Sequence, residues 1–215
     1  MLEKNQYSLY LFTHKIWYIM KLNLSWSLFS LPTILWFFFM QFSLSLTLFH
    51  VVILSILMII NLLPNTFALT NMIKQNSEGL PLLKKMFSTL KANYFKYLKH
   101  SAFWGIVLLL LLTYRVLFSA NAVLIGILDL LMVIYAIMLA IFAVTMAHQN
   151  KSIKHQLIDS LIISFTKGKM FLITLIMVIV GLIATIFIPF IPFVIVIALL
   201  LFILNKLYSH YLAED

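Results

Sequence analysis

Two charged residues lie inside hydrophobic sequence, away from the other charges of the chain, and they are the first candidates for chemistry. Arg115 stands near the end of one apolar segment, and Asp129 lies about two turns into the next. An ionisable side chain within a membrane is costly unless it is paired. We expect either a gate or charged-ligand site, or a structural ion pair within one hairpin. A third interpretation has Arg115 reaching the outer interface while Asp129 makes a separate polar contact.

A second candidate set consists of polar residues and prolines that interrupt the first two apolar segments. Its members are Asn23, Ser30, Pro32, Asn61, Pro64, Asn65 and Thr66. Polar groups beside broken helices line ligand cavities in transporters. Hydrogen bonds between the two helices explain the same residues without a ligand. Trp26 has two similar interpretations, as a surface for ligand stacking or as an anchor at the membrane interface.

The other reactive residue types form no pattern that predicts catalysis. Cysteine is absent, which excludes a thiol nucleophile and a cysteine-based metal site. The histidines lack the spacing of a metal-binding motif, and the 5 glycines are too scattered for a phosphate-binding loop. We therefore predict a protein that is not an enzyme and that has no cofactor and no metal site.

The composition is typical of an integral membrane protein. Apolar residues make up 64% of the 215 residues, the mean hydropathy is +1.09, and charged residues make up 10%. A soluble domain carries about 25% charged residues. The net charge of +9 does not indicate a nucleic-acid partner, because no polar domain is present to form a groove. Basic loops beside anionic lipid explain this charge better, so the lipid bilayer is the expected partner.

The positions of the basic residues predict the topology. Apart from Arg115, the 15 basic residues are lysines, and they fall in 1–21, 70–100, 148–169 and the tail with Lys206. Lysine-rich loops stay in the cytoplasm, so each of the three apolar blocks between them should cross out and back. We predict an all-α polytopic bundle of six transmembrane helices in three hairpins, forming a single membrane domain over residues 1–215. The expected spans are 22–40, 47–69, 101–118, 122–147, 170–188 and 192–207.

The reversals between paired spans are set by short breaks in hydrophobicity. A polar stretch at 41–45 separates the first pair, and Ser119 to Asn121 separates the second. In the third block, Pro189 and Pro192 offer a reversal, since proline is favoured at the start of a helix. The alternative is five spans with one long, kinked last helix. Six spans place both termini in the cytoplasm.

Two basic loops have the pattern of amphipathic helices that lie in the inner membrane interface. In 80–99 and in 152–165, apolar residues recur at spacings of three and four, with lysines mostly off that face. A basic amphipathic segment followed by a hydrophobic hairpin thus occurs three times. This is a repeat of pattern that either a transporter or a simple helical bundle would show.

Three short strings resemble the YesL-like family of uncharacterised bacterial membrane proteins. Residues 22–33 read LNLSWSLFSLPT, similar to the family's L-N-x-x-W-x-x-x-S-L-P. Residues 64–69 read PNTFAL, similar to P-A-T-x-A-L, and residues 87–94 read FSTLKANY, similar to F-x-x-x-[FL]-K-x-N-[FY]. Their order and spacing agree with the family over nearly the whole chain.

This resemblance implies a multi-pass protein of the bacterial cytoplasmic membrane, encoded near carbohydrate ABC importers. The implied function is that of a non-enzymatic accessory protein in carbohydrate uptake or its regulation, with an ABC importer or another membrane protein as partner. The alternative is a small transporter, or a membrane protein that binds lipid or a small molecule. No catalytic residue follows from the resemblance.

Overall fold

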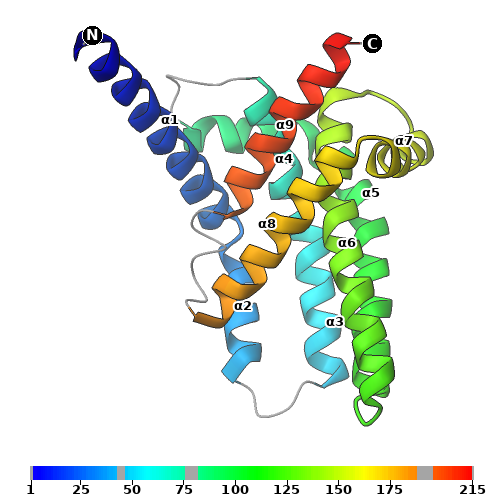
Figure 1. The fold of residues 1–215 in the computed structure, drawn as a ribbon. Helices are drawn as coiled ribbons and strands as arrows, with labels where there is room; N and C mark the ends of the chain where they lie inside the picture. Colours follow the sequence, from blue (N-terminus) through cyan, green and yellow to red (C-terminus); the bar gives the residue numbers. More distant parts are fainter. Residues whose placement is uncertain (1, 43–46, 76–81, 188–195, 215) are drawn as a thin grey trace.

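The computed structural model describes residues 2–42, 47–75, 82–187 and 196–214, and every element in these ranges is helical (Figure 1). The elements are α1 (Leu2–Phe29), α2 (Leu31–Phe42), α3 (Leu48–Leu57), η1 (Met58–Leu62), α4 (Leu63–Lys74), α5 (Leu82–Leu117), α6 (Ala122–His148), α7 (Ile153–Thr166), α8 (Gly168–Phe187) and α9 (Ile197–Glu214). The all-α prediction is confirmed for this part of the chain.

Three helical segments are long and apolar enough to cross a membrane: Leu48–Lys74, Leu82–Leu117 and Ala122–His148. Two further spans are obtained if each of two bent helix pairs, α1 with α2 and α7 with α8, counts as one crossing. The helix α9 is apolar but shorter than these. The prediction of membrane spans is therefore confirmed by length and composition, whereas the count of six remains a prediction.

The first predicted span, 22–40, is divided between two helices. The axes of Thr13–Phe29 and Leu31–Met40 meet at an angle of 74°. The break is at Ser30, and Pro32 lies in the first turn of α2. A proline is tolerated there because the first N–H groups of a helix have no intrahelical acceptor. Pro32 thus helps to begin a second helix, and the interruption that the sequence indicated in this segment is a bend between two helices.

The second predicted span, 47–69, forms one helical path made of α3, η1 and α4. The middle element η1 is a π-helical turn, in which the Leu63 N–H donates to the Met58 carbonyl. The interruption that the sequence indicated at Asn61, Pro64, Asn65 and Thr66 is therefore present, and the irregular turn begins at Met58, three residues before Asn61. The polar break expected at 41–45 falls largely on residues 43–46, outside the described residues.

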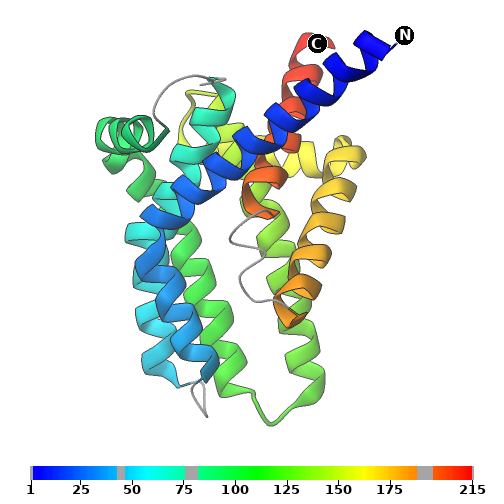
Figure 2. The same cartoon turned by 90° about the vertical axis from the view of Figure 1, so that its left-hand side faces the viewer.

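The interfacial helix expected at 80–99 and the span expected at 101–118 form one continuous helix, α5. It has 36 residues, about 54 Å at 1.5 Å per residue, because neither glycine nor proline separates the two segments. Its first turns lie across the end of the bundle, and the rest runs along it (Figure 1 and Figure 2). At Gly105, α5 approaches η1 so closely that an added Cβ would overlap the Ile59 side chain.

α6, α7 and α8 follow their predicted ranges closely, whereas α9 ends at Glu214, seven residues beyond the span expected at 192–207. α6 begins after Asn121, whose side-chain oxygen accepts hydrogen bonds from two backbone N–H groups of the first turn, each at 3.2 Å. α7 corresponds to the amphipathic segment expected at 152–165 and meets α8 at an angle of 92°. The proposed reversal at Pro189 and Pro192 lies outside the described residues.

The bundle has one end that carries both chain termini, α7 and the first turns of α5, and an opposite end that carries the α5–α6 turn (Figure 1). The helix α4 lies at the centre and packs on α1, α5, α6 and α9. Its apolar side chains are at most 7% exposed, namely Leu63, Phe67, Ala68, Leu69, Met72 and Ile73. The breaks in α1–α2 and at η1 lie next to this core.

Candidate functional site

Most members of the predicted polar set meet where the two broken helices face each other. At the bend, the Thr33 N–H donates to the Ser30 carbonyl. In a regular helix it would donate to the Phe29 carbonyl, four residues earlier. The Asn61 amide of η1 donates to that Phe29 carbonyl at 2.8 Å. In return, the Thr33 hydroxyl donates to the Asn61 side-chain oxygen at 2.9 Å, and it lies 3.3 Å from the Leu57 carbonyl.

Two further contacts extend this polar cluster toward α4. The Asn65 amide donates to the Ser30 hydroxyl at 3.2 Å, and both residues are at most 4% exposed. The Trp26 indole donates to the Thr66 hydroxyl at 3.1 Å, and that hydroxyl also donates to the Leu62 carbonyl one turn earlier. Trp26 is fully buried, so its side chain is a hydrogen-bonded part of the core and does not face an interface.

The two prolines of the set have different surroundings. Pro64 is buried in α4 and has no N–H to donate to the Ile60 carbonyl one turn earlier. The Tyr94 hydroxyl of α5 donates to that carbonyl at 2.9 Å. Pro32, in contrast, is exposed on α2.

Asn23 links the beginning of the chain to its end. Its side-chain oxygen accepts a hydrogen bond of 3.0 Å from the Ala198 N–H in the first turn of α9, and Asn23 is fully buried. The first N–H groups of a helix have no acceptor within the helix. Asn23 therefore acts as a cap supplied by a helix that is distant in sequence.

The cavity beside this cluster is apolar. It has a volume of about 330 Å³ and is lined by Thr33, Ile34, Phe37, Met40, Leu54, Met58, Leu62, Leu108, Leu112 and Met132. Among the described polar side chains of this cluster, Thr33 is the one that reaches this lining. The described residues of the cluster thus make hydrogen bonds between helices, and an apolar cavity lies next to them.

Arg115 and Asp129 form an ion pair near the α5–α6 turn. The Arg115 Nε lies 2.7 Å from an Asp129 oxygen, and the side chains are 40% and 50% exposed. The two candidates are thus brought together, away from the end that carries the termini (Figure 1). In the described ranges, no three His, Asp or Glu side chains gather where they could hold a metal ion.

The sequence interpretation missed a polar junction around the C-terminal end of α6. The last carbonyls of a helix lack intrahelical donors and carry partial negative charge. Lys74 of α4 donates to the Ala147 carbonyl at 2.9 Å, and Gln156 of α7 donates to the Gln149 carbonyl at 3.0 Å. His148 lies 3.1 Å from the Asn205 side-chain oxygen of α9. Side chains from three other helices thus converge on one helix end.

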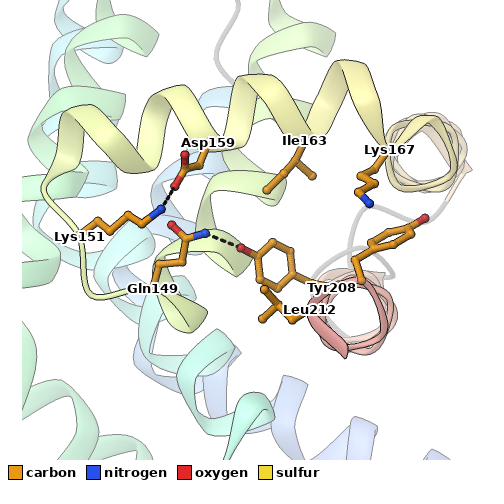
Figure 3. A pocket seen from close by; sticks show the side chains of 8 residues that line it. Gln149, Lys151, Asp159, Ile163, Lys167, Tyr208 and Leu212 are labelled. Atoms are coloured by element: carbon orange, nitrogen blue, oxygen red, sulfur yellow. Dashed lines mark hydrogen bonds and ion pairs between the residues drawn. The ribbon is translucent and has the colours of Figure 1, made fainter. Parts of the chain in front are cut away.

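Next to this junction, α7 and α9 enclose a pocket of about 190 Å³ (Figure 3). Lys151 and Asp159 form an ion pair of 2.7 Å on one side, and the Lys167 ammonium lies 4.7 Å from the centre of the Tyr211 ring on the other. Gln149 projects between them and donates to the Tyr208 hydroxyl at 2.7 Å.

Two groups in this pocket remain polar and neutral. Burial raises the pKa of Tyr208, so its hydroxyl stays protonated at neutral pH. The side-chain oxygen of Gln149 is buried and has no hydrogen-bond partner. This oxygen is thus a buried acceptor without a donor at the edge of the pocket.

The missed signal was the polar face of 152–165. Gln156, Ser160 and Ser164 recur every four residues, and these three residues are buried. The apolar residues on the other side, including Leu161 and Phe165, are 46% and 84% exposed. The sequence thus predicted the helix but not which of its faces packs on the bundle.

No family model matches this chain, and no curated protein or solved structure matches it either. The resemblance to the YesL-like family therefore depends on the three sequence strings alone. Residues of two of these strings, at 22–33 and 64–69, contribute to the polar cluster described above.

Proposed function

We propose that the chain is a non-enzymatic accessory protein of the bacterial cytoplasmic membrane, with six crossings and both termini in the cytoplasm. The observation that carries the membrane location is the orientation of α7. This helix buries Gln156 and Ser160 and exposes Leu161, Ile162 and Phe165. A helix at a water-facing surface has the opposite orientation, whereas lipid can cover the apolar face of α7.

The distribution of lysines supports the orientation. Lys84 and Lys91 belong to the first turns of α5, Lys154 to α7 and Lys169 to the first turn of α8, and these segments lie with both termini at one end of the bundle (Figure 1). The described residues of the α5–α6 turn at the opposite end, 118–121, contain no lysine. Basic segments remain on the cytoplasmic side of a membrane, so this end faces the cytoplasm in the proposal.

In the accessory role, a partner protein binds the basic end of the bundle, which carries both termini and the lysine-rich segments. The resemblance to the YesL-like family suggests that this partner is a carbohydrate ABC importer. The exposed lysines at Lys91 and Lys154 offer a surface for acidic groups of that partner. A buried contact of 2.9 Å between His100 of α5 and Gln156 of α7 joins the two helices that carry these lysines.

Site-specific photo-crosslinking in cells tests this function. A crosslinker at Lys91 or at Lys154 is expected to capture an importer subunit. The same crosslinker at Val123, which is 73% exposed next to the α5–α6 turn, is the control and should capture none. A protein that gives no adduct from the basic positions, or equal adducts from Val123, contradicts the accessory role.

The apolar cavity favours a second function, the binding of a lipid chain or another apolar molecule. Its volume of about 330 Å³ lies at the lower end of the range of small-ligand pockets. Leu108→Trp would fill it, and we expect this variant to lose a lipid that co-purifies with the wild type, as measured by mass spectrometry of the extracted protein. An unchanged lipid content in the folded variant contradicts this function.

A further inference from the structure

A groove of about 540 Å³ runs between α1 and α9, separate from the cavity and the pocket described above. Its floor is apolar and includes Ile19 of α1 with Phe202 and Ile203 of α9. Its basic residues are Lys15 of α1 with Lys206 and His210 of α9. The volume falls within the range of ligand sites, about 300 to 1,000 Å³.

The basic and apolar residues follow the same order along both helices. α1 and α9 run in opposite directions, with the N-terminal end of α1 and the C-terminal end of α9 at the same end of the bundle (Figure 1 and Figure 2). Along α1, Lys15 lies nearer to that end than Ile19. Along α9, Lys206 and His210 lie nearer to it than Phe202. The groove is therefore basic at the end with the termini and apolar toward the middle of the bundle.

A groove that is basic at one end and apolar at the other matches a ligand with an anionic head and an apolar tail. Among the described residues that line the groove there is no acidic side chain, so the two lysines favour an anion. The lining from Leu199 to His210 extends about 16 Å along α9, close to the thickness of one hydrocarbon leaflet, about half of 30 Å. A phosphate alone would use the lysines but would leave the apolar floor uncovered.

We propose that this groove binds an anionic phospholipid, with its headgroup phosphate between Lys15 and Lys206 and an acyl chain over Ile19, Phe202 and Ile203. The proposal rests on the membrane location in the proposed function, but it needs no importer. The lipid differs from the ligand of the cavity at Thr33, whose lining has no charged residue to select a headgroup.

Native mass spectrometry of the purified full-length protein tests the proposal. The probes are phosphatidylglycerol and phosphatidylcholine with identical acyl chains. We expect the wild type to retain phosphatidylglycerol preferentially. Lys15→Gln with Lys206→Gln should weaken it about thirtyfold, since a lysine beside anionic lipid contributes about fivefold, and should weaken phosphatidylcholine much less, because its choline cation offsets the charge of its phosphate.

A matched control removes the same charge elsewhere. Lys91→Gln with Lys154→Gln changes two exposed lysines that do not line the groove, and it should retain the wild-type preference. Ile203→Trp, which fills the floor, should weaken both lipids. Equal retention of the two lipids by the wild type, an equal loss in the control, or full competition by inorganic phosphate would each overturn the proposal. None of these outcomes depends on the crosslinking to an importer.

Discussion

Asn61 is the residue whose replacement most sharply tests how the two broken helices are held together. Its amide donates to the Phe29 carbonyl, which the bend at Ser30 leaves without its helical donor, and its oxygen accepts from Thr33. Asn61→Ala removes both hydrogen bonds and leaves the carbonyl unsatisfied. We expect the variant to fold with the same helices but with lower stability.

The expected loss of stability in Asn61→Ala follows from the two hydrogen bonds that Asn61 makes. Hydrogen bonds between membrane helices contribute on average about 0.6 kcal/mol each, with a maximum near 1.7 kcal/mol. A buried polar group left without a partner costs about 1 to 3 kcal/mol. We therefore expect Asn61→Ala to lower the free energy of unfolding by about 1 to 3 kcal/mol.

The assay is reversible unfolding in bicelles titrated with SDS. Asn93→Ala is the matched control, because the Asn93 amide donates at 3.3 Å to a carbonyl of its own helix, and we expect a change within about 0.5 kcal/mol. Thr33→Val with Asn61→Ala completes a double-mutant cycle, with an expected coupling of at least about 0.5 kcal/mol. Equal losses for Asn61→Ala and Asn93→Ala, or a coupling of zero, would refute the interpretation.

Three other predictions concern single contacts of the bundle. Asn23→Ala removes the cap of α9 and should lower stability by about 1 kcal/mol; unchanged unfolding in SDS titration would exclude that cap. Gly105→Ala forces a methyl group against the isoleucine of η1 and should cost about 1 to 3 kcal/mol, whereas Gly126→Ala, with open space around it, should be neutral; equal thermal shifts for the two variants would count against the close approach. Asp129→Asn breaks an exposed pair and should cost about 0.2 to 1 kcal/mol, and exchanging the charges with Arg115→Asp and Asp129→Arg should restore stability; if the exchange restores nothing, the pair does not act as an ion pair.

Hydrophobic length and the spacing of lysines predicted the helices well because these properties are local. The ranges of α6 and α7 agree closely with 122–147 and 152–165, and the reversal at Asn121 follows from its ability to cap a helix. The sequence indicated an interruption of the first segment around Ser30 and Pro32 but not its form, because proline has two opposite effects. It kinks the interior of a helix but begins a new one equally well, and the sequence does not distinguish these positions.

The partners of the polar side chains could not be predicted because they come from distant parts of the chain. Asn23 accepts its hydrogen bond from an N–H of α9 that lies 175 residues later, and the α6 junction combines α4, α7 and α9. The sequence placed Asn61 and Thr66 in a candidate set, but hydrogen bonding and ligand binding require the same residue types. Only the spatial arrangement shows that an amide lies opposite a free carbonyl.

The central claim is that the basic end of the bundle, with both termini, faces the cytoplasm. The chain has no cysteine, so single-cysteine variants give labelling without background. In intact cells, an impermeant maleimide should modify Ser119→Cys, at the α5–α6 turn, and should leave Lys154→Cys and Ala213→Cys unmodified until the cells are opened. Labelling of Ala213→Cys from outside, on the same side as Ser119→Cys, would contradict the proposed architecture.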